Sequence, residues 1–411
     1  MIDVERVQAA LAERRSGYSL PQAMYLDPTL YEADLEAVFA AEWLFACNGC
    51  EIPRPGDYIT FEVGRDPVVV LRDRDGQIRA FHNSCRHRGS RICQAETGHA
   101  TRLICPYHQW VYELDGSLRN ARQMPKEFDK STQGLAPIAT EVICGLVYIC
   151  LAETPPNISR FRAEVTPFIA PHRPDRVKVA HQTTLVEDAN WKLVIENNRE
   201  CYHCAGNHPE LLATLIEFAL PDDQAGTAVF KDLMTRKAAA WDAAGLPHAP
   251  AHGGLEFRCI RLPFHEGAVS FTTDGRQACQ KLLGDFTDPD LGSVRMFRVP
   301  NNWHHFLSDH IIHFRILPLD VNRTVLKTTW LVHEDAVEGV DYDVKTLTEV
   351  WEVTNRQDAD LGALNHKGIA SRSYRPGRYA PSEFMLTNFT DWYAGKLAQH
   401  FGKPRLAEAA E

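Results

Sequence analysis

The sequence lacks features that mark several classes of protein. No apolar run is long enough to span a membrane, and no tract is repeated or of low complexity. No GxGxxG motif is present, so nothing indicates a dinucleotide-binding unit. Basic residues are outnumbered, 44 against 54 acidic ones, and the resulting net charge of −10 argues against binding to nucleic acid or to an anionic membrane.

The composition is otherwise that of an ordinary globular protein. The 411 residues suffice for two or three domains, and 44% of them are hydrophobic. The first residues, MIDVERVQAALAERR, have the pattern of a charged amphipathic helix rather than of a signal peptide, so we expect a cytoplasmic location.

Eleven cysteines in a reducing compartment are not expected to form a disulfide framework. Most should be buried core residues, and a few are candidates for metal ligands. Two C-x-x-C pairs, Cys47 with Cys50 and Cys201 with Cys204, are interpreted as buried, inert thiols rather than as a zinc site or a redox pair.

The period of the hydrophobic pattern changes along the chain. Residues 1–42 have a helical pattern that is broken between Tyr18 and Pro28, and residues 43–155 read as short strands joined by turns, with a hairpin over Tyr58–Phe81. Residues 156–411 mix both periods, whereas residues 221–254 have little pattern and are expected to form a flap. The elements expected in this last part are a strand over Val177–Val186, a helix over Asn190–Asn207, and strands over Ile311–Leu317 and Thr324–Val332.

Two short cysteine–histidine motifs stand in the β-rich segment. A C-x-H motif contains Cys85 and His87, and a C-x-x-H motif contains Cys105 and His108. Two thiolates and two imidazoles at hairpin tips fit a tetrahedral zinc ion. They fit equally a two-iron cluster with cysteine on one iron and histidine on the other.

A second potential metal site lies in the stretch ENNRECYHCAGNHPE. His203 and His208 are five residues apart, a spacing that directs side chains about 140° apart on a regular helix. Gly206 and Pro209 would loosen the backbone so that both imidazoles reach one ion. Such a pair suits iron, zinc, copper or nickel, with a carboxylate as third ligand. The alternative is a pair of polar histidines at the end of a helix.

The third ligand is indicated by the apolar stripe of a helix expected over Tyr342–Asn365. Asp358 lies seven residues after Trp351 and three before Leu361, and so it falls on the inward face. Asp360 is about 200° away and should face solvent. A buried carboxylate is costly unless it pairs with a base or binds a metal, and both interpretations stay open for Asp358.

Taken in order, these motifs resemble those of the α subunits of Rieske non-haem iron oxygenases. NSCRHRGSRIC and LICPYHQWVYELDGSL are similar to the Rieske [2Fe–2S] signature, and E-x-x-H-x-x-x-x-H followed by Q-D on a helix is similar to the catalytic pattern. The resemblance implies an α+β fold: N-terminal helices (1–42) that pack on the catalytic domain, an all-β Rieske domain (43–155), and a catalytic domain (156–411) of antiparallel sheet wrapped by helices, of the helix-grip type.

The resemblance also implies two sets of iron ligands and an oligomer. The ligands of the [2Fe–2S] cluster would be Cys85 and Cys105 on one iron and His87 and His108 on the other. The mononuclear Fe(II) would be held by His203, His208 and Asp358. Members of the family are usually head-to-tail homotrimers, in which an acidic residue bridges the centres of neighbouring subunits. Here that residue would be Glu200, where many relatives have the shorter aspartate.

Three further stretches, ENNRECYHCAGNHPEL, TTWLVHEDAVEGVDYD and TNRQDADLGALNHKGI, resemble the branch of the family that acts on quaternary ammonium compounds. This implies O2-dependent hydroxylation of an N-methyl group of a betaine, such as glycine betaine or stachydrine, with release of formaldehyde. Because the chain has neither a GxGxxG motif nor a plant-type ferredoxin cysteine run, electrons from NAD(P)H should arrive through a separate flavin and iron–sulfur reductase.

The substrate implied by this resemblance restricts the binding site. A quaternary nitrogen donates no hydrogen bond, so aromatic faces and a nearby carboxylate should hold it. Candidates are Phe218, Trp303 and Trp330, although aromatic residues more often simply pack in the core, and that is the alternative for each. The alternatives are an aromatic-ring dioxygenase, a choline- or carnitine-type monooxygenase, and an electron carrier that needs only the first 155 residues.

Overall fold

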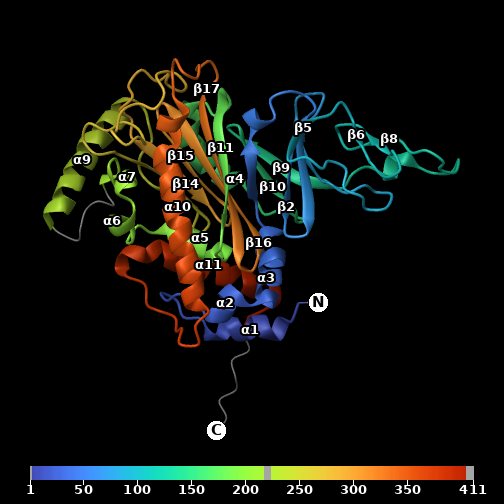
Figure 1. Ribbon diagram of the computed structural model, residues 1–411, viewed down its shortest axis with the longest axis horizontal. Coiled ribbons are helices and arrows are strands. Elements are labelled where there is room, and N and C mark those ends of the chain that lie inside the picture. Colours follow the sequence, from blue (N-terminus) through green and yellow to red (C-terminus); the bar gives the residue numbers. More distant parts are fainter. Residues whose placement is uncertain (1, 217–223, 404–411) are drawn as a thin grey trace, which may run out of the picture. The chain divides into compact units, whose positions relative to one another are not determined.

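The protein, analysed as a computed structural model that describes residues 2–216 and 224–403, divides into two compact units (Figure 1). One unit runs from Phe39 to Asn157, and the other contains the chain up to Val38 and from Ile158 onward. Within the described residues, no helix has the length and apolar character needed to cross a bilayer.

The first unit is all β. Its main sheet is antiparallel, with seven strands in the order β1-β10-β9-β4-β3-β2-β5, and a smaller sheet has the order β6-β7-β8. The strands are β1 (Leu44–Asn48), β2 (Asp57–Val63), β3 (Asp66–Arg72), β4 (Ile78–His82), β5 (Thr97–His99), β6 (Leu103–Ile104), β7 (Val111–Tyr112), β8 (Leu118–Asn120), β9 (Pro137–Ile143) and β10 (Leu146–Cys150). The predicted hairpin is confirmed: Tyr58 pairs with Leu71, and β4 follows after a turn at Gly76, where φ is 80°.

The second unit is built on another antiparallel sheet of seven strands, in the order β11-β17-β16-β15-β14-β13-β12. Its strands are β11 (Val177–Glu187), β12 (Ala251–His252), β13 (Phe257–Leu262), β14 (Ser293–Arg298), β15 (Asn302–Phe306), β16 (His310–Asp320) and β17 (Arg323–His333). The three predicted strands of this part correspond to β11, β16 and β17. The predicted α+β fold class is confirmed by these two units.

Helices complete the chain. They are α1 (Val4–Glu13), α2 (Gln22–Leu26), α3 (Pro28–Asp34), the π-helix η1 (Leu35–Phe39), α4 (Ser159–Ile169), α5 (Trp191–Arg199), α6 (Cys204–Asn207), α7 (Pro209–Leu212), α9 (Gln224–Ala243), α10 (Val344–Ile369) and α11 (Phe384–Phe401), with 3-10 turns η2 (Gly49–Glu51), η3 (Lys130–Thr132), η4 (Ala170–His172) and η5 (Pro381–Glu383). Helix α1 packs on α11, where Gln8 donates a hydrogen bond to the carbonyl of Phe401.

Two helices position the site of the second unit, and each begins at a side-chain cap. Asn190 accepts a hydrogen bond from the amide of Lys192 at the start of α5, and Asp343 accepts one from Thr346 at the start of α10. Helix α10 crosses in front of the strands in Figure 1 and is tied to β17 by Asn355, whose amide donates to Thr328 Oγ1 at 3.0 Å.

Two predictions about helices in this unit were wrong. The helix expected over Asn190–Asn207 ends at Arg199, because Glu200 has extended backbone angles, φ −131° and ψ 171°. The part of 221–254 that the structure describes is not patternless, since α9 occupies twenty residues of it. Leu233 and Trp241, eight residues apart, lie on one face of α9 and are both buried.

Candidate metal centres and the adjoining cavity

Two similar turns present the cysteine–histidine motifs of the β unit. The carbonyl of Cys85 accepts a hydrogen bond from the amide of Gly89 at 2.9 Å, and that of Cys105 accepts one from Gln109 at 3.1 Å. Both donors have positive φ, 75° for Gly89 and 59° for Gln109. Glycine adopts this conformation freely and glutamine rarely does, so Gln109 is held there by its surroundings.

The four potential ligands of this unit converge. Cys85 and Cys105 are buried, the rings of His87 and His108 lie 4.5 Å apart, and His87 stacks on Trp110. The Nδ1 atom of His87 is buried and has no hydrogen-bond partner among the residues that the structure describes. A buried nitrogen of this kind is costly unless something binds it, and a metal cluster held by two thiolates and two imidazoles supplies that partner.

The two thiols differ in electrostatic surroundings. Burial raises the pKa of Cys85, although the hydroxyl of Tyr112, 3.2 Å from its sulfur, opposes the shift. Burial acts on Cys105 in the same direction, but the backbone N–H groups of Tyr107 and His108 hold its pKa below the usual value. Donors aimed at a sulfur stabilise the thiolate, which is the form that binds metals.

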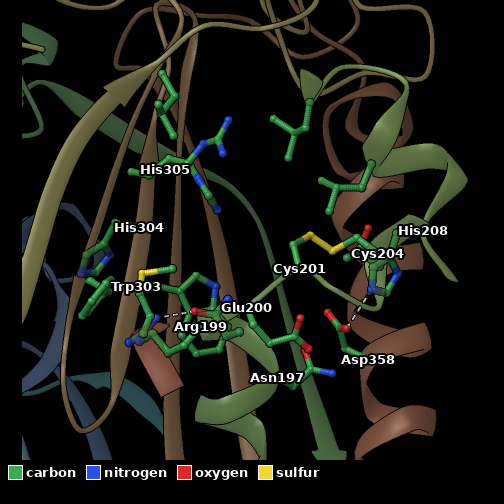
Figure 2. A pocket seen from close by; sticks show the side chains of 18 of the residues that line it. Asn197, Arg199, Glu200, Cys201, Cys204, His208, Trp303, His304, His305 and Asp358 are labelled. Carbon is green, nitrogen blue, oxygen red and sulfur yellow. Dashed lines mark hydrogen bonds and ion pairs between the residues drawn. A yellow bond between two sulfur atoms is a disulfide. The ribbon is translucent and has the colours of Figure 1, made fainter. Parts of the chain in front are cut away.

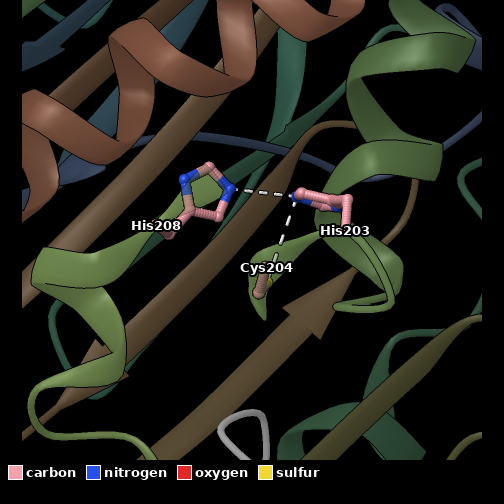
Figure 3. Close-up of side chains that lie close together, drawn as sticks. All are labelled: His203, Cys204 and His208. Atoms are coloured by element: carbon pink, nitrogen blue, oxygen red, sulfur yellow. Dashed lines mark hydrogen bonds between the residues drawn. The ribbon is translucent and has the colours of Figure 1, made fainter. Parts of the chain in front are cut away.

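The second cluster lies in the other unit and joins α10 to the turns around α6 (Figures 2 and 3). The Nε2 atoms of His203 and His208 are 3.0 Å apart, and Asp358 Oδ1 lies 3.3 Å from the first and 3.0 Å from the second. Ligand atoms about 2.0–2.1 Å from an ion and at right angles to one another lie about 3 Å apart. The three side chains therefore have the spacing of adjacent ligands of a single ion.

Local backbone structure explains how both histidines reach this point. His203 precedes the short helix α6 and His208 follows it, with φ −126° and ψ 62° before Pro209. A residue before proline is excluded from the α region, so the turn that brings His208 back is encoded in the sequence. Asp358 faces the histidines from the inward side of α10, and Asp360 is exposed, as predicted.

Each imidazole uses its other nitrogen to bond a neighbour. His203 Nδ1 lies 2.5 Å from Glu200 Oε1, and His208 Nδ1 lies 2.7 Å from Gln357 Oε1. Gln357 in turn donates to Glu210 Oε2 at 3.2 Å. Acceptors at both Nδ1 atoms fix the tautomer that leaves Nε2 available, an arrangement usual for metal-bound histidines. The part played by Gln357 was not found from the sequence, although it adjoins Asp358.

The charges in this cluster are interdependent. Burial raises the pKa of Asp358, but the bonds from His203 and His208 outweigh it and leave the pKa below its usual value. Burial lowers the pKa of His203, whereas Asp358 and Glu200 raise it, to about 9. Carboxylates that stabilise positive charge on the two imidazoles would likewise stabilise a metal cation bound in place of those protons.

A cavity of about 150 Å³ adjoins the second cluster and is bounded by α5, β13, β14, β15 and α10 (Figure 2). Aromatic side chains (Phe297, Trp303 and Trp351) and aliphatic ones (Leu211, Leu215 and Ile260) form much of its wall. Three arginines also line it, Arg199, Arg258 and Arg295. An apolar cavity with a few cationic groups suits a small molecule that carries both apolar and anionic parts.

The three aromatic residues proposed as substrate contacts lie in different places. Trp303 lines the cavity, and Phe218 lies outside the described residues. Trp330 is fully buried on β17, packs at a tilt against the ring of His181, and is not among the described residues that line the cavity. It shares a strand face with Thr328, which contacts α10, so the structure favours the core-packing alternative that the sequence left open for Trp330.

Two histidines of the cavity wall were not predicted. Burial lowers the pKa of His304 and of His305 well below the usual range, so both are neutral. His304 Nδ1 lies 2.9 Å from His313 Nδ1, and His305 stacks on Trp351. In the sequence they read as ordinary strand residues, and only the pairing of β15 with β14 and β16 brings them to the cavity.

One of the C-x-x-C pairs is not a pair of inert thiols. Cys201 and Cys204 form a disulfide with Cα atoms 4.9 Å apart, and both line the cavity, so the prediction for this pair was wrong. The extended residue Glu200 and the turn that follows it bring the two Cβ atoms together. Cys47 and Cys50 remain thiols, buried and half-buried.

Comparison with known proteins agrees with both units. A family model described as Rieske [2Fe-2S] domain matches residues 42–140, and one described as ring hydroxylating alpha subunit (catalytic domain) matches residues 174–399. The chain is 48% identical to the glycine betaine monooxygenase oxygenase subunit of Pseudomonas aeruginosa, over 96% of this chain and 92% of that protein. The corresponding subunit of Chromohalobacter salexigens is 47% identical, over 94% and 87%.

The fold has solved counterparts. A crystal structure of a quaternary ammonium Rieske monooxygenase that oxidises carnitine superposes with a TM-score of 0.71 over 95% of this chain and 98% of that chain, at 23% identity. A naphthalene 1,2-dioxygenase has a TM-score of 0.69 at 20% identity, over 98% of this chain and 96% of that chain. At such identities the likeness establishes the fold alone.

Proposed function

Because the chain belongs to the ring-hydroxylating α subunits of the Rieske non-haem iron oxygenases, and is a monooxygenase of that family, we propose that it N-demethylates a quaternary ammonium betaine, either glycine betaine or stachydrine. The observation that carries the proposal is 48% identity, across nearly the full length of both chains, to a glycine betaine monooxygenase oxygenase subunit.

The donor sets described above fit the irons that the family implies. Cys85, Cys105, His87 and His108 would hold the [2Fe–2S] cluster. His203, His208 and Asp358 would hold the mononuclear Fe(II). When bound, the cluster relays single electrons and the Fe(II) activates O2. The chain's own part is to fix the imidazoles, bind the substrate beside them and restrict water at the reacting methyl group.

The cavity supports a small substrate. Its volume, about 150 Å³, is well below the range of about 300–1,000 Å³ usual for drug-sized ligands, and so it favours a compact betaine over a polycyclic arene. The indole of Trp303 offers a face to the quaternary ammonium group, which cannot donate a hydrogen bond. Two carboxylates, Glu200 and Asp358, also line the cavity and supply negative charge for the cation.

Of Arg199 and Arg258, two of the cavity's arginines, Arg258 is the better placed to receive the substrate carboxylate. Arg199 already donates to Asn198 Oδ1 and to the carbonyl of Asn302, and lies over the ring of Phe297. Arg258 donates to Met385 Sδ at 3.4 Å, and a thioether is a weak acceptor that a carboxylate readily replaces.

The overall reaction balances with O2 and two electrons. One oxygen atom is inserted into a C–H bond of the methyl group, and the other leaves as water with two electrons and two protons. The carbinolamine then breaks its C–N bond, the electron pair stays on nitrogen, and formaldehyde and a proton are released. The electrons come from NAD(P)H through a separate reductase.

Glu200 is proposed as the bridge between subunits of a head-to-tail homotrimer. One carboxylate oxygen bonds His203 and the other accepts the amide of Tyr202, which orients the group. The second oxygen keeps a lone pair for His108 of a neighbouring copy. Electrons would then pass from His108 of the neighbouring copy through Glu200 to His203. The longer side chain of glutamate, compared with aspartate, would help it to reach both histidines from the extended backbone at this residue.

The test compares substrates side by side. Purified oxygenase, a competent reductase, NADH and O2 are combined with glycine betaine, stachydrine or benzoate, and O2 consumption is recorded. The proposal predicts uptake with a betaine and none above background with benzoate. Uptake with benzoate alone would assign the chain to the aromatic-ring dioxygenases instead.

A further inference from the structure

Beside the proposed iron site lies a sulfur atom that the facial triad does not use. Cys204 Sγ is 4.0 Å from His203 Nε2, and a ring nitrogen of His203, a ring nitrogen of His208 and this sulfur all lie within 4.8 Å of one another (Figure 3). The same sulfur is bonded to Cys201, as the yellow link in Figure 2 shows. Cys204 is therefore a potential metal ligand whose sulfur is already bonded to another cysteine.

The sulfur is nearly at ligand distance. In a tetrahedral zinc site, Zn–S of about 2.3 Å and Zn–N of about 2.0–2.1 Å put sulfur and nitrogen about 3.5 Å apart. Cys204 Sγ would need to move by about 0.5 Å toward His203 and by up to about 1.3 Å toward His208 to meet that spacing. Cys204 precedes Ala205 at the first turn of α6, and breaking its bond to Cys201 removes the tie that holds it away from the ion.

We propose that the Cys201–Cys204 pair is a redox gate on metal selection at this site. The proposal rests on the metal centre of the proposed function, but not on its substrate. In the disulfide form, the ligands are His203, His208 and Asp358, a set with open positions that suits Fe(II). In the dithiol form, Cys204 joins the two histidines, and a His2Cys set with a soft thiolate favours zinc, which has no redox chemistry, over Fe(II).

The switching chemistry needs only common reagents. A small dithiol exchanges with the disulfide, so that the Cys201–Cys204 bond breaks, the reductant forms its own disulfide, and two thiols result. Peroxide reverses the step: one thiolate is oxidised to a sulfenic acid, and the second thiol displaces water to re-form the bond. Cys201 is half-buried and both sulfurs border the cavity, so reagents of this size have a path.

The location of the pair gives the gate its effect. Cys201 follows Glu200 and Cys204 follows His203, so the disulfide closes a ring of four residues that contains a proposed ligand. An oxidised ring both withholds the thiolate and restrains His203 beside Glu200. Reduction releases both restraints together. The soft thiolate of Cys204 can then take the place of the hard carboxylate of Asp358 as third ligand.

Two matched serine variants test the gate. Cys201→Ser leaves Cys204 permanently without its bonding partner, and Cys204→Ser removes the proposed ligand while breaking the same disulfide. Full-length protein that carries its cluster is freed of the mononuclear metal and given one equivalent of Zn2+. Zinc K-edge X-ray absorption then reports the ligand atoms directly, without dependence on turnover.

We expect a Zn–S shell at about 2.3 Å in Cys201→Ser and in wild-type protein reduced with a phosphine that carries no thiol, and only nitrogen and oxygen ligands in Cys204→Ser and in the oxidised wild type. The Zn2+ affinity of Cys201→Ser should exceed that of Cys204→Ser by roughly tenfold or more. Zinc that occupies the cluster site by mistake would contribute sulfur equally to both variants and cancels in the comparison.

The possible outcomes separate the two proposals. Zinc bound through nitrogen and oxygen alone in every sample, or with equal affinity in both variants, would overturn the gate and leave the metal centre intact. Failure of all samples to bind zinc would remove the metal centre itself. Mass spectrometry of alkylated protein tests whether the disulfide forms. The proposal predicts that the peptide with Cys201 and Cys204 is alkylated only after reduction. Alkylation of these cysteines in the untreated oxidised protein would contradict it.

Discussion

Glu200 Oε1 lies 2.5 Å from Nδ1 of His203, on the side of the imidazole opposite to the Nε2 atom that faces His208 and Asp358. The glutamate is therefore not one of the three clustered ligands but the group that orients one of them. Because its second oxygen is fixed by the amide of Tyr202, the carboxylate is held in place before any neighbouring subunit arrives.

Replacement of Glu200 should separate electron transfer from metal binding. Glu200→Gln keeps the size but weakens the bond to His203, and Glu200→Ala removes it. Both variants should keep iron at both centres and reduce normally at the cluster, yet turn over roughly 10- to 100-fold more slowly. Single-turnover oxidation of a pre-reduced cluster, with substrate and O2, measures the step. Wild-type rates in Glu200→Ala would show that the carboxylate is merely structural.

The bond from Gln357 to His208 should matter for the metal. Gln357→Ala removes the acceptor that fixes the His208 ring, and the affinity of the site for Fe(II) should fall roughly 10- to 100-fold. Arg356→Ala is the matched control, since the side chain of this neighbouring residue is exposed and pairs, within the described part of the chain, with Glu352. Equal iron retention by the two variants in chelator competition would contradict this role.

The two tryptophans proposed from the sequence should now behave differently. Trp303→Ala removes an aromatic face worth about 0.5–2 kcal/mol to a cation, so KM for the betaine should rise roughly 3- to 30-fold, and Trp303→Phe should restore much of the loss. Trp330→Ala should instead lower the free energy of unfolding by about 3–5 kcal/mol, because it empties a core position. A KM effect confined to Trp330 would reverse the assignment.

Glu196 predicts a dependence of stability on pH. Burial raises the pKa of this carboxyl to about 8, although Tyr25, which donates to it at 2.8 Å, opposes the shift. The folded state thus holds a proton that the unfolded state releases near pH 4.3, a typical value for glutamate. Stability should fall as pH rises from there to about 8, relative to Glu196→Gln, and change no further above that. The free energies of unfolding of the two proteins, measured with urea, are compared across this pH range. The same pH dependence in both proteins would refute the shift in the pKa of Glu196.

The parts of the site that could be predicted are those set by local sequence. The spacing of His203, His208 and Asp358 rests on a proline turn and on the stripe of one helix, and both are legible along the chain. The break at Glu200 was not predictable, since it depends on a side-chain bond to His203 that forms only in the folded turn. The same turn brings Cys201 and Cys204 within bonding distance, which no count of cysteines reveals.

Features of the site that depend on the packing of distant strands could not be predicted from the sequence either. Arg258, His305 and Trp351 come from two strands and a helix, and the sheet order and the packing of α10 place them around one cavity. Trp330 and Trp303 both lie on strands of the same sheet, and only the surroundings that the fold gives each one distinguish a core residue from a cavity wall. Helix α9 was not predicted because the two positions that are buried among its described side chains, Leu233 and Trp241, are too few to give a clear apolar stripe.

The most direct test of the central claim is the stoichiometry of turnover with methyl-labelled glycine betaine and stachydrine, a competent reductase, NADH and O2. For at least one of them, the account predicts one labelled formaldehyde and one demethylated amine for each O2 and each NADH consumed. NMR of the quenched mixture measures both products. Oxygen consumption without formaldehyde from either betaine, or a cis-diol from an aromatic acid under the same conditions, would contradict it.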